Sequence, residues 1–414
     1  NASYYDTPAK ELFTSKCDML RHWIPELNYR SSWIGGVRKD GPLRVAIISS
    51  HLHKWSSVTF TSLWKIRYFN FTTVFGISEN TTGIDIKNYN KLSGHFHTDV
   101  KTIESGHFDV IIYPAIHLHC YIDMLAMCRL APVQLTTWGH SDTSGMDSID
   151  YYLTSNIFEE SECQKYYSEQ VILDDSLSVY YHTYELPPLK SEPENTILCA
   201  ATPYKWNKHM ITAIKKIQQH TDSSLSIINY DNIDGFDDII TWLSNASIRY
   251  KVLPQSCLLS FIEYIKNSLF ILDSWPFGNC NISFQAMSVG KFTLTYPSSR
   301  LYGRFTQGLY NKMDLPELIV HSWDEYVTKA IDLIKNPCEI LKIEDIISKN
   351  CHKIFCDEKS IVNFPKIIHT ISKLPPILHF VYGLKQVEEL CFIHFYMVCY
   401  FLQPRRNYLF MVSL

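Results

Sequence analysis

Two short segments in the second half of the chain contain residue types that could bind an anion. Lys205 stands in ATPYKWN, residues 201–207, between a predicted strand and a predicted helix. The sequence PFGN, residues 276–279, precedes another predicted helix, and its glycine permits a sharp turn that leaves the amides of residues 280–282 at a helix N-terminus. An ammonium group and such a terminus suit a pyrophosphate, which gains negative charge when it departs in a reaction.

Histidines follow two predicted strands in the first half of the chain. His51 and His53 lie in SSHLHKWSS, and His117 and His119 lie in PAIHLHC. Because imidazole titrates near neutral pH, a histidine in such a loop can act as a general base. The alternative interpretation is a solvated loop residue. Paired histidines can also bind metal, but no carboxylate or cysteine stands at a recognisable ligand spacing, so we expect no metal site.

A third polar turn contains His140, within RLAPVQLTTWGHSDTSGMDSIDYYL, residues 129–153. A proline ends the preceding predicted helix, residues 133–136 form a predicted strand, and hydroxyl side chains follow the turn. His140 therefore joins the two histidines of the first loop as a catalytic candidate.

Short apolar runs alternate with amphipathic stretches and predict the elements that position these loops. Predicted strands of the first half comprise residues 43–49, 72–76, 110–113, 133–136, 150–153 and 171–173. Those of the second half comprise residues 196–200, 225–228, 249–253 and 269–273, and predicted helices cover residues 122–129, 208–219 and 258–267. Buried runs of this kind are typical of parallel sheets, in which ligands bind at the carboxyl ends of the strands. The pattern predicts an α/β protein with two Rossmann-like, doubly wound domains that face a central cleft.

The length of 414 residues exceeds what one hydrophobic core organises, which supports this division. A Pro-rich segment, ELPPLKSEPEN, separates the two groups of strands. We expect an N-terminal helical extension in residues 1–40, a first Rossmann-like domain in residues 41–190 and a second Rossmann-like domain in residues 191–372. Residues 373–414 form an apolar tail.

Composition restricts the partners and the compartment. A formal net charge of −4 and a pI near 6.5 argue against nucleic-acid binding, which needs a basic surface. Twelve scattered cysteines without a CxxC pair indicate reduced thiols, and no N-terminal apolar run resembles a signal peptide, so we expect a cytoplasmic protein.

The apolar run at residues 391–402 is too short to span a bilayer. The tail can return to the first domain as a helix or expose an apolar surface to a partner or a membrane.

The segments described above resemble glycosyltransferase family 41, which includes the eukaryotic O-linked N-acetylglucosamine transferase and the bacterial adhesin N-glucosyltransferases. ATPYKWN resembles the family's donor-diphosphate loop with its lysine. PFGNCN, followed by GLYNKMDLPELIV, resembles the bacterial branch especially. The N-terminal match comprises Arg129, APVQ at residues 131–134, Gly139-His140, Thr143-Ser144 and Asp150-Tyr151, with Ser141 in place of the usual proline.

The resemblance implies a GT-B fold in which a UDP-sugar binds in the second domain and a polypeptide acceptor approaches from the first domain. Enzymes of this family invert the anomeric carbon and need no metal or other cofactor, because a lysine and helix amides neutralise the diphosphate. By position, the resemblance assigns phosphate contacts to Thr202 and Lys205, base stacking to Phe261, and the lining of the pyrophosphate to Asn279, Cys280 and Asn281.

Three further positions depart from the family pattern. Gln285 stands where an aspartate would contact the ribose. Trp55 aligns with the family's histidine in the opening loop, so a functional histidine there has moved to His51 or His53 or has been lost. Ile282 replaces a small or hydroxyl residue beside the phosphates.

Three functional hypotheses follow. The leading one is an inverting, metal-independent transferase that moves glucose, galactose or N-acetylglucosamine from a UDP-sugar to Asn or Ser/Thr of a protein. The departures leave open a non-catalytic relative that acts as a binding or scaffold protein. A UDP-sugar 2-epimerase of the same fold is the third, and the APVQ and PFGN segments argue against it.

Overall fold

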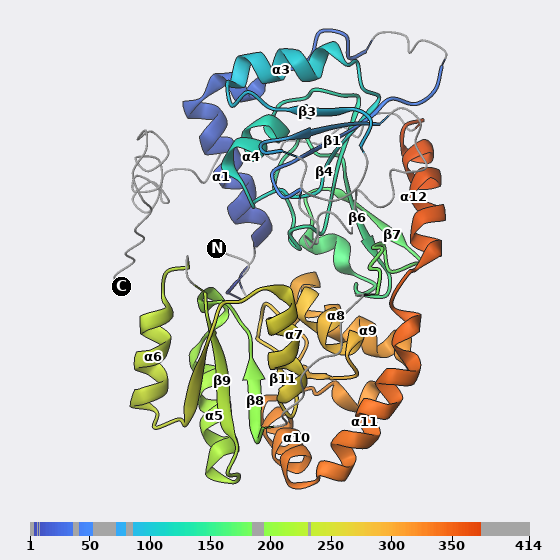
Figure 1. The fold of residues 1–414 in the computed structure, drawn as a ribbon. Coiled ribbons are helices and arrows are strands. Elements are labelled where there is room, and N and C mark those ends of the chain that lie inside the picture. Colours follow the sequence, from blue (N-terminus) through green and yellow to red (C-terminus); the bar gives the residue numbers. More distant parts are fainter. Residues whose placement is uncertain are drawn as a thin grey trace.

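The computed structural model describes residues 4–5, 7, 9–35, 41–52, 72–79, 86–183, 194–230 and 233–373. Within these residues the chain forms two parallel β-sheets, each covered by helices on both faces, and Figure 1 shows one domain above the other. This arrangement confirms the predicted pair of doubly wound α/β domains.

The first sheet has seven strands in the order β3-β2-β1-β4-β5-β6-β7, and every neighbouring pair is parallel. Its strands are β1 (Val45–Ser49), β2 (Thr72–Gly76), β3 (Tyr89–Lys91), β4 (Val110–Tyr113), β5 (Val133–Thr137), β6 (Tyr151–Ser155) and β7 (Gln170–Asp174). The strand order reverses direction between β1 and β4, and such a switch point is where ligands bind in open α/β sheets.

Alternate residues of β1 enter two different cores because successive strand side chains point to opposite faces. Ala46 and Ile48 pack with α1 (Ala9–Trp23), α3 (Phe96–Ser105) and α4 (Cys120–Met127), beside the short 3₁₀ helix η2 (Pro25–Asn28). Val45 and Ile47 pack with the last described helix, α12 (Glu358–Ile371). A strand that is buried at every position therefore needs helices on both sides, which is what the sequence pattern predicted.

The second sheet has five parallel strands in the order β10-β9-β8-β11-β12. Its strands are β8 (Thr196–Cys199), β9 (Ser224–Asn229), β10 (Tyr250–Pro254), β11 (Ile271–Leu272) and β12 (Thr293–Leu294). The surrounding helices are α5 (Lys208–Gln219), α6 (Phe236–Asn245), α7 (Leu258–Asn267), α8 (Asn281–Ser288), α9 (Phe305–Met313), α10 (Trp323–Lys335) and α11 (Pro337–Asn350). Here the order reverses between β8 and β11, so the loops after these two strands meet at the switch point.

The two domains share a buried contact surface. The ring of Trp138, just after β5, lies 4.8 Å from that of Phe305 on α9, and Phe158 lies 5.2 Å from Phe305 on another side. Arg304 Nε donates to the carbonyl oxygen of Phe158 at 2.8 Å, and its Nη1 lies 2.8 Å from Glu160. Aromatic packing and a charged hydrogen bond therefore fix one domain against the other.

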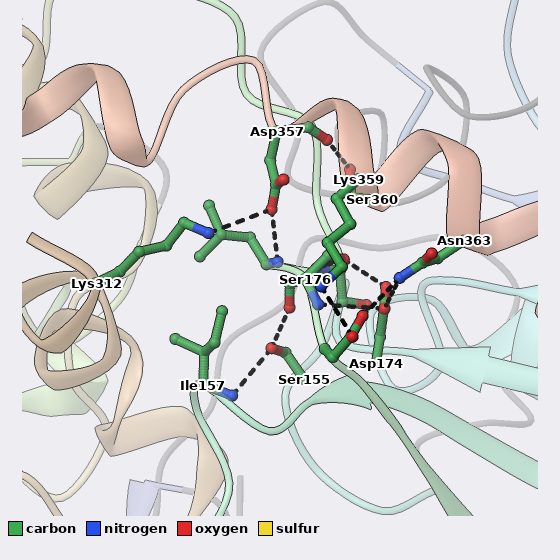
Figure 2. A network of polar contacts seen from close by, with 12 residues as sticks. Ser155, Ile157, Asp174, Ser176, Lys312, Asp357, Lys359, Ser360 and Asn363 are labelled. Atoms are coloured by element: carbon green, nitrogen blue, oxygen red, sulfur yellow. Dashed lines mark hydrogen bonds and ion pairs between the residues drawn. The ribbon is translucent and has the colours of Figure 1, made fainter.

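The chain returns to the first domain at its described end. In Figure 1, α12 follows α11 of the second domain and then lies along the first sheet. Figure 2 shows the polar network at this crossing. Asp357, which precedes α12, accepts a hydrogen bond from the backbone amide of Leu177 at 2.7 Å and lies 3.8 Å from Lys312 Nζ of α9. Asn363 Nδ2 donates to Asp174 at 2.7 Å and to Asp175 at 2.8 Å.

We expect Asp357→Ala to lower the free energy of unfolding by about 1–3 kcal/mol, because the buried amide of Leu177 loses its acceptor. Chemical denaturation of both proteins measures this difference. Asp175→Ala is the matched control. It removes a carboxylate of the same network that is exposed to solvent, and we expect little change. Equal free energies of unfolding of Asp357→Ala and the wild type would show that the hydrogen bond between Asp357 and Leu177 does not stabilise the protein.

Two strands were not predicted from the sequence, and in each case the sequence of the strand explains why. β3 has the polar sequence YNK with two exposed residues, and β12 has two residues, so neither produces a recognisable apolar run. The linker at residues 184–193 and the tail from residue 374 lie outside the described residues. Within the described part of the chain, no helix combines the length and the apolar character needed to cross a membrane.

Candidate functional site

The loop after β8 contains Lys205 in a 3₁₀ turn, η5 (Pro203–Lys205). The carbonyl oxygen of Thr202 accepts a hydrogen bond from the backbone amide of Lys205 at 3.0 Å. Asn207 then caps α5, because its Oδ1 accepts from the amides of the second and third residues after it at 2.9 and 3.2 Å. Lys205 therefore lies between a proline that begins the turn and an asparagine that caps the following helix, and these two residues define its position.

The side chain of Lys205 reaches the PFGN loop, residues 276–279, which follows β11. Its Nζ donates to the carbonyl oxygen of Gly278 at 2.8 Å and lies 4.6 Å from the ring centroid of Phe277. Burial lowers the pKa of Lys205 to about 8, and Asp273 opposes this effect. The structure thus places Lys205 beside the loop that the sequence analysis paired with it.

Helix α8 begins directly after this loop, with Cys280 as its N-cap residue. The carbonyl oxygen of Cys280 accepts hydrogen bonds from the amides of Ser283 and Phe284 at 3.0 and 3.2 Å, so the helix is formed from its first turn. The first amides of a helix, here those of Asn281 and Ile282, have no partner inside the helix. They are available to an anion, which the helix dipole also favours.

The side chain of Asn279 is buried beside these amides, with 1% of its surface exposed. Neither its Oδ1 nor its Nδ2 has a hydrogen-bond partner among the described residues. A buried amide without partners costs about 1–3 kcal/mol per lost group, so native proteins rarely retain one unless a ligand or water satisfies it. This amide therefore marks a place where a polar ligand can bind.

Among the described histidines of the first domain, His140 is the one whose ring lies beside the PFGN loop. It follows β5, and its ring lies edge-on to Phe277, with centroids 6.2 Å apart, and edge-on to His117 at 5.7 Å. Burial lowers the pKa of His140 to about 3, and His117 acts in the same direction. The ring is therefore neutral at physiological pH, and its buried Nδ1 has no partner among the described residues.

His117 and His119 have structural roles in this arrangement. The Nε2 of His117 lies 3.0 Å from the carbonyl oxygen of Thr143, and its backbone amide donates to Asp123 at 2.8 Å. His119 caps α4, since its Nδ1 accepts from the amide of Tyr121 at 3.2 Å. Both rings thus organise the loop beside His140.

Of the opening-loop candidates, the structure describes His51 and not His53. His51 follows β1, and its Nδ1 lies 2.7 Å from Ser50 Oγ. β1 and β5 are separated by β4 in the sheet, so His51 and His140 leave strands that are not neighbours. His53 and Trp55 lie outside the described residues.

Two further predicted contacts lie on the helices around the PFGN loop. Phe261 is on α7 and packs in the apolar cluster that also contains Ile282 of α8. Gln285 is partly buried and lies on α8 four residues after Asn281, which places both on the same face of the helix.

Asp273 and Tyr181 also lie at the site and were not among the predicted residues. The Oδ1 of Asp273 accepts a hydrogen bond from the backbone amide of Asn279 at 2.6 Å. The hydroxyl of Tyr181 donates to Asn281 Oδ1, and its ring stacks on Phe284 at 3.9 Å. A signal for Asp273 was present, because it ends a predicted strand just before PFGN. Tyr181 is 100 residues from its partner and had no such signal.

The described residues include no group of three or more His, Cys, Asp or Glu side chains placed to bind a metal ion. The polar groups that converge are an ammonium, helix amides and a side-chain amide. These are donors for an anion rather than ligands for a cation.

Comparison with proteins of known sequence gives two kinds of relative. The UDP-glucose:protein N-beta-glucosyltransferase of Actinobacillus pleuropneumoniae is 25% identical over 264 residues, which are 60% of this chain and 42% of that protein. The probable UDP-N-acetylglucosamine–peptide N-acetylglucosaminyltransferase SPINDLY of Petunia hybrida is 30% identical over 274 residues, 62% of this chain and 28% of that protein. The chain thus spans less than half the length of either relative. No protein-family model matches it.

Solved structures agree on the fold. An O-GlcNAc transferase mutant of Thermobaculum terrenum superposes with a TM-score of 0.76 at 16% identity, covering 90% of this chain and 75% of that one. The Anabaena protein HepE in complex with UDP superposes with a TM-score of 0.51 at 9% identity, covering 80% of this chain and 100% of that one. The two-domain GT-B architecture that the sequence motifs implied is confirmed.

Proposed function

We propose, since the chain is related in sequence to glycosyltransferase family 41, that it transfers a hexose from a UDP-sugar to a side chain of a polypeptide, with inversion and without a metal ion. The observation that supports this most is the convergence of Lys205, the first amides of α8 and the side-chain amide of Asn279, which has no partner among the described residues, at the switch point of the second sheet. All three are donors, and a diphosphate offers several acceptor oxygens.

The donor would bind with its diphosphate between Lys205 and the N-terminus of α8. During transfer the bond between the anomeric carbon and the diphosphate oxygen breaks, and negative charge increases on the departing UDP. An ammonium and oriented amides stabilise this charge more in the transition state than in the ground state, which lowers the barrier. Thr202 and Cys280 would complete the phosphate contacts, Gln285 would contact the ribose, and Phe261 would contact the base.

The acceptor would approach from the first domain, where His140 faces the PFGN loop. Its imidazole is neutral, the form that can accept the proton that the acceptor nitrogen or oxygen loses as it bonds to the anomeric carbon, although burial makes it a weak base. His51 stays a second candidate for this role because it also follows a strand of the first sheet.

The test is transfer of radiolabel from UDP-glucose, UDP-galactose and UDP-N-acetylglucosamine to a peptide library that contains Asn, Ser and Thr. We expect one of the three sugars to label peptide, in EDTA as well as without it. His140→Phe keeps an aromatic ring but cannot accept a proton, so we expect it to bind UDP and to lose about 100-fold or more in transfer rate.

The alternatives give different results in the same assay. UDP binding without peptide labelling would favour a non-catalytic binding protein. Release of an epimerised nucleotide sugar without labelling would favour an epimerase. Loss of transfer in EDTA that added Mg²⁺ restores would refute the metal-independent mechanism.

A further inference from the structure

Asp273 is a buried carboxylate directly behind the PFGN loop. It follows β11, and 3% of its surface is exposed. Its Oδ1 accepts a hydrogen bond from the backbone amide of Asn279 at 2.6 Å, and its Oδ2 accepts one from the hydroxyl of Thr295 at 2.7 Å. Burying a carboxylate is costly, so its presence here calls for compensating donors or a compensating charge.

The peptide group between Gly278 and Asn279 connects this carboxylate to Lys205. The carbonyl oxygen of Gly278 accepts from Lys205 Nζ at 2.8 Å, while the amide of Asn279 donates to Asp273. Hydrogen bonds at both ends of one peptide group polarise it in the same sense and reinforce each other. The packing is close, because a Cβ on Gly278 would lie 3.2 and 3.3 Å from the two carboxylate oxygens.

The surroundings single out Asp273 as the counter-charge of Lys205. Among the described residues, the titratable groups that face Lys205 are Asp273, Cys280 and Cys199. Burial raises the pKa of both thiols to about 12, so they are neutral at physiological pH. Asp273 is faced by Lys205 and, in addition, by Thr295, Thr306, Tyr310, Tyr326, Cys199 and Cys280.

We propose that Asp273 is a positioning residue that acts through the Gly278–Asn279 peptide: it fixes the PFGN loop and, as the counter-charge of Lys205, keeps that side chain an ammonium ready to bind a diphosphate. The diphosphate part rests on the proposed function, whereas the coupling between Asp273 and Lys205 does not. The same hydrogen bond fixes the backbone of Asn279, whose side-chain amide has no partner among the described residues.

Asp273→Asn tests this inference, because it removes the charge and keeps the size and one acceptor oxygen. NMR titration of the ¹³Cε-labelled lysines, with Lys205 assigned from Lys205→Arg, reports the coupling without any ligand. We expect the Lys205 midpoint in Asp273→Asn to fall by about one pH unit or more. UDP-glucose affinity should then fall about fivefold or more at pH 8 and about twofold or less at pH 6.

A merely structural role gives another result: the affinity would fall by the same factor at both pH values, and the Lys205 midpoint would not move. That outcome would overturn the proposal. Asp273→Glu restores the charge, and we expect it to bring the midpoint back toward the wild-type value.

The inference stays testable if the variants do not fold and if the wild type does not bind a UDP-sugar. If neither variant folds, ¹³Cγ NMR of the wild type decides, because a midpoint of Asp273 above pH 7 would mean that it is protonated and provides no counter-charge. If the wild type binds no UDP-sugar, the proposed function fails, while the Lys205 titration still decides the role of Asp273.

Discussion

Lys205→Ala is expected to weaken UDP binding by about 2–5 kcal/mol, on the order of 30- to 4,000-fold in Kd. The change removes the ammonium that lies beside the PFGN loop and the N-terminus of α8. A diphosphate bound there would lose its charge-assisted hydrogen bond in a region of low dielectric, where such bonds are strongest. Isothermal titration calorimetry with UDP measures the difference, in EDTA so that metal plays no part.

Lys208→Ala is the matched control for this experiment. It removes the same charge three residues later, from an exposed position in the first turn of α5, so we expect UDP affinity within about twofold of the wild type. Circular dichroism checks that Lys205→Ala is folded, since the variant also leaves the carbonyl oxygen of Gly278 without its donor. Unchanged UDP affinity in a folded Lys205→Ala protein would remove this side chain from the site.

The affinity for UDP-glucose is expected to fall as the pH rises above about 8. Burial lowers the pKa of Lys205 to about 8, so the ammonium is complete below this value and is lost above it. Only the charged form attracts a diphosphate, and the sign is therefore a loss of binding toward alkaline pH. With one proton linked to binding, the affinity should fall about tenfold per pH unit well above the midpoint, or roughly tenfold between pH 7 and pH 9.

UDP-glucose is the suitable ligand because both of its phosphates are esterified and do not titrate in this range. Lys205→Arg is the control, because a guanidinium stays charged throughout. We expect its affinity, whatever its absolute value, to stay nearly constant from pH 7 to pH 9, below the range in which the uracil N3–H of the ligand ionises. If the wild type also shows a flat profile, the ammonium of Lys205 does not contribute to donor binding.

Much of the local structure could be predicted from the sequence, because apolar periodicity reports backbone geometry over a few residues. The helices α5 (Lys208–Gln219) and α7 (Leu258–Asn267) have the predicted bounds, and the predicted strands recur within one or two residues at each end. The short strands β3 and β12 were missed, since their pairing depends on neighbours and not on their own sequence.

The candidate residues that belong to sequence motifs could be predicted. Those that reach the site only through tertiary contacts could not. Lys205 and Asn279 belong to motifs, and the structure brings their segments together. Tyr181 and Asp273 act through contacts with those segments. Tyr181 lies in a loop just before the linker, and neither composition nor spacing indicates which distant helix a loop tyrosine contacts.

The sequence by itself determined that two doubly wound domains form and that the segments proposed to bind an anion follow β8 and β11, because strand patterning and turn chemistry are local properties. Tertiary structure alone decided that the ring of His140 lies beside that of Phe277. It also decided that α12 returns to cover the first sheet and that one peptide group lies between Lys205 and Asp273. These outcomes depend on how the two domains pack and on which groups pair with buried charges. Both are interactions between segments that are tens to hundreds of residues apart in the sequence.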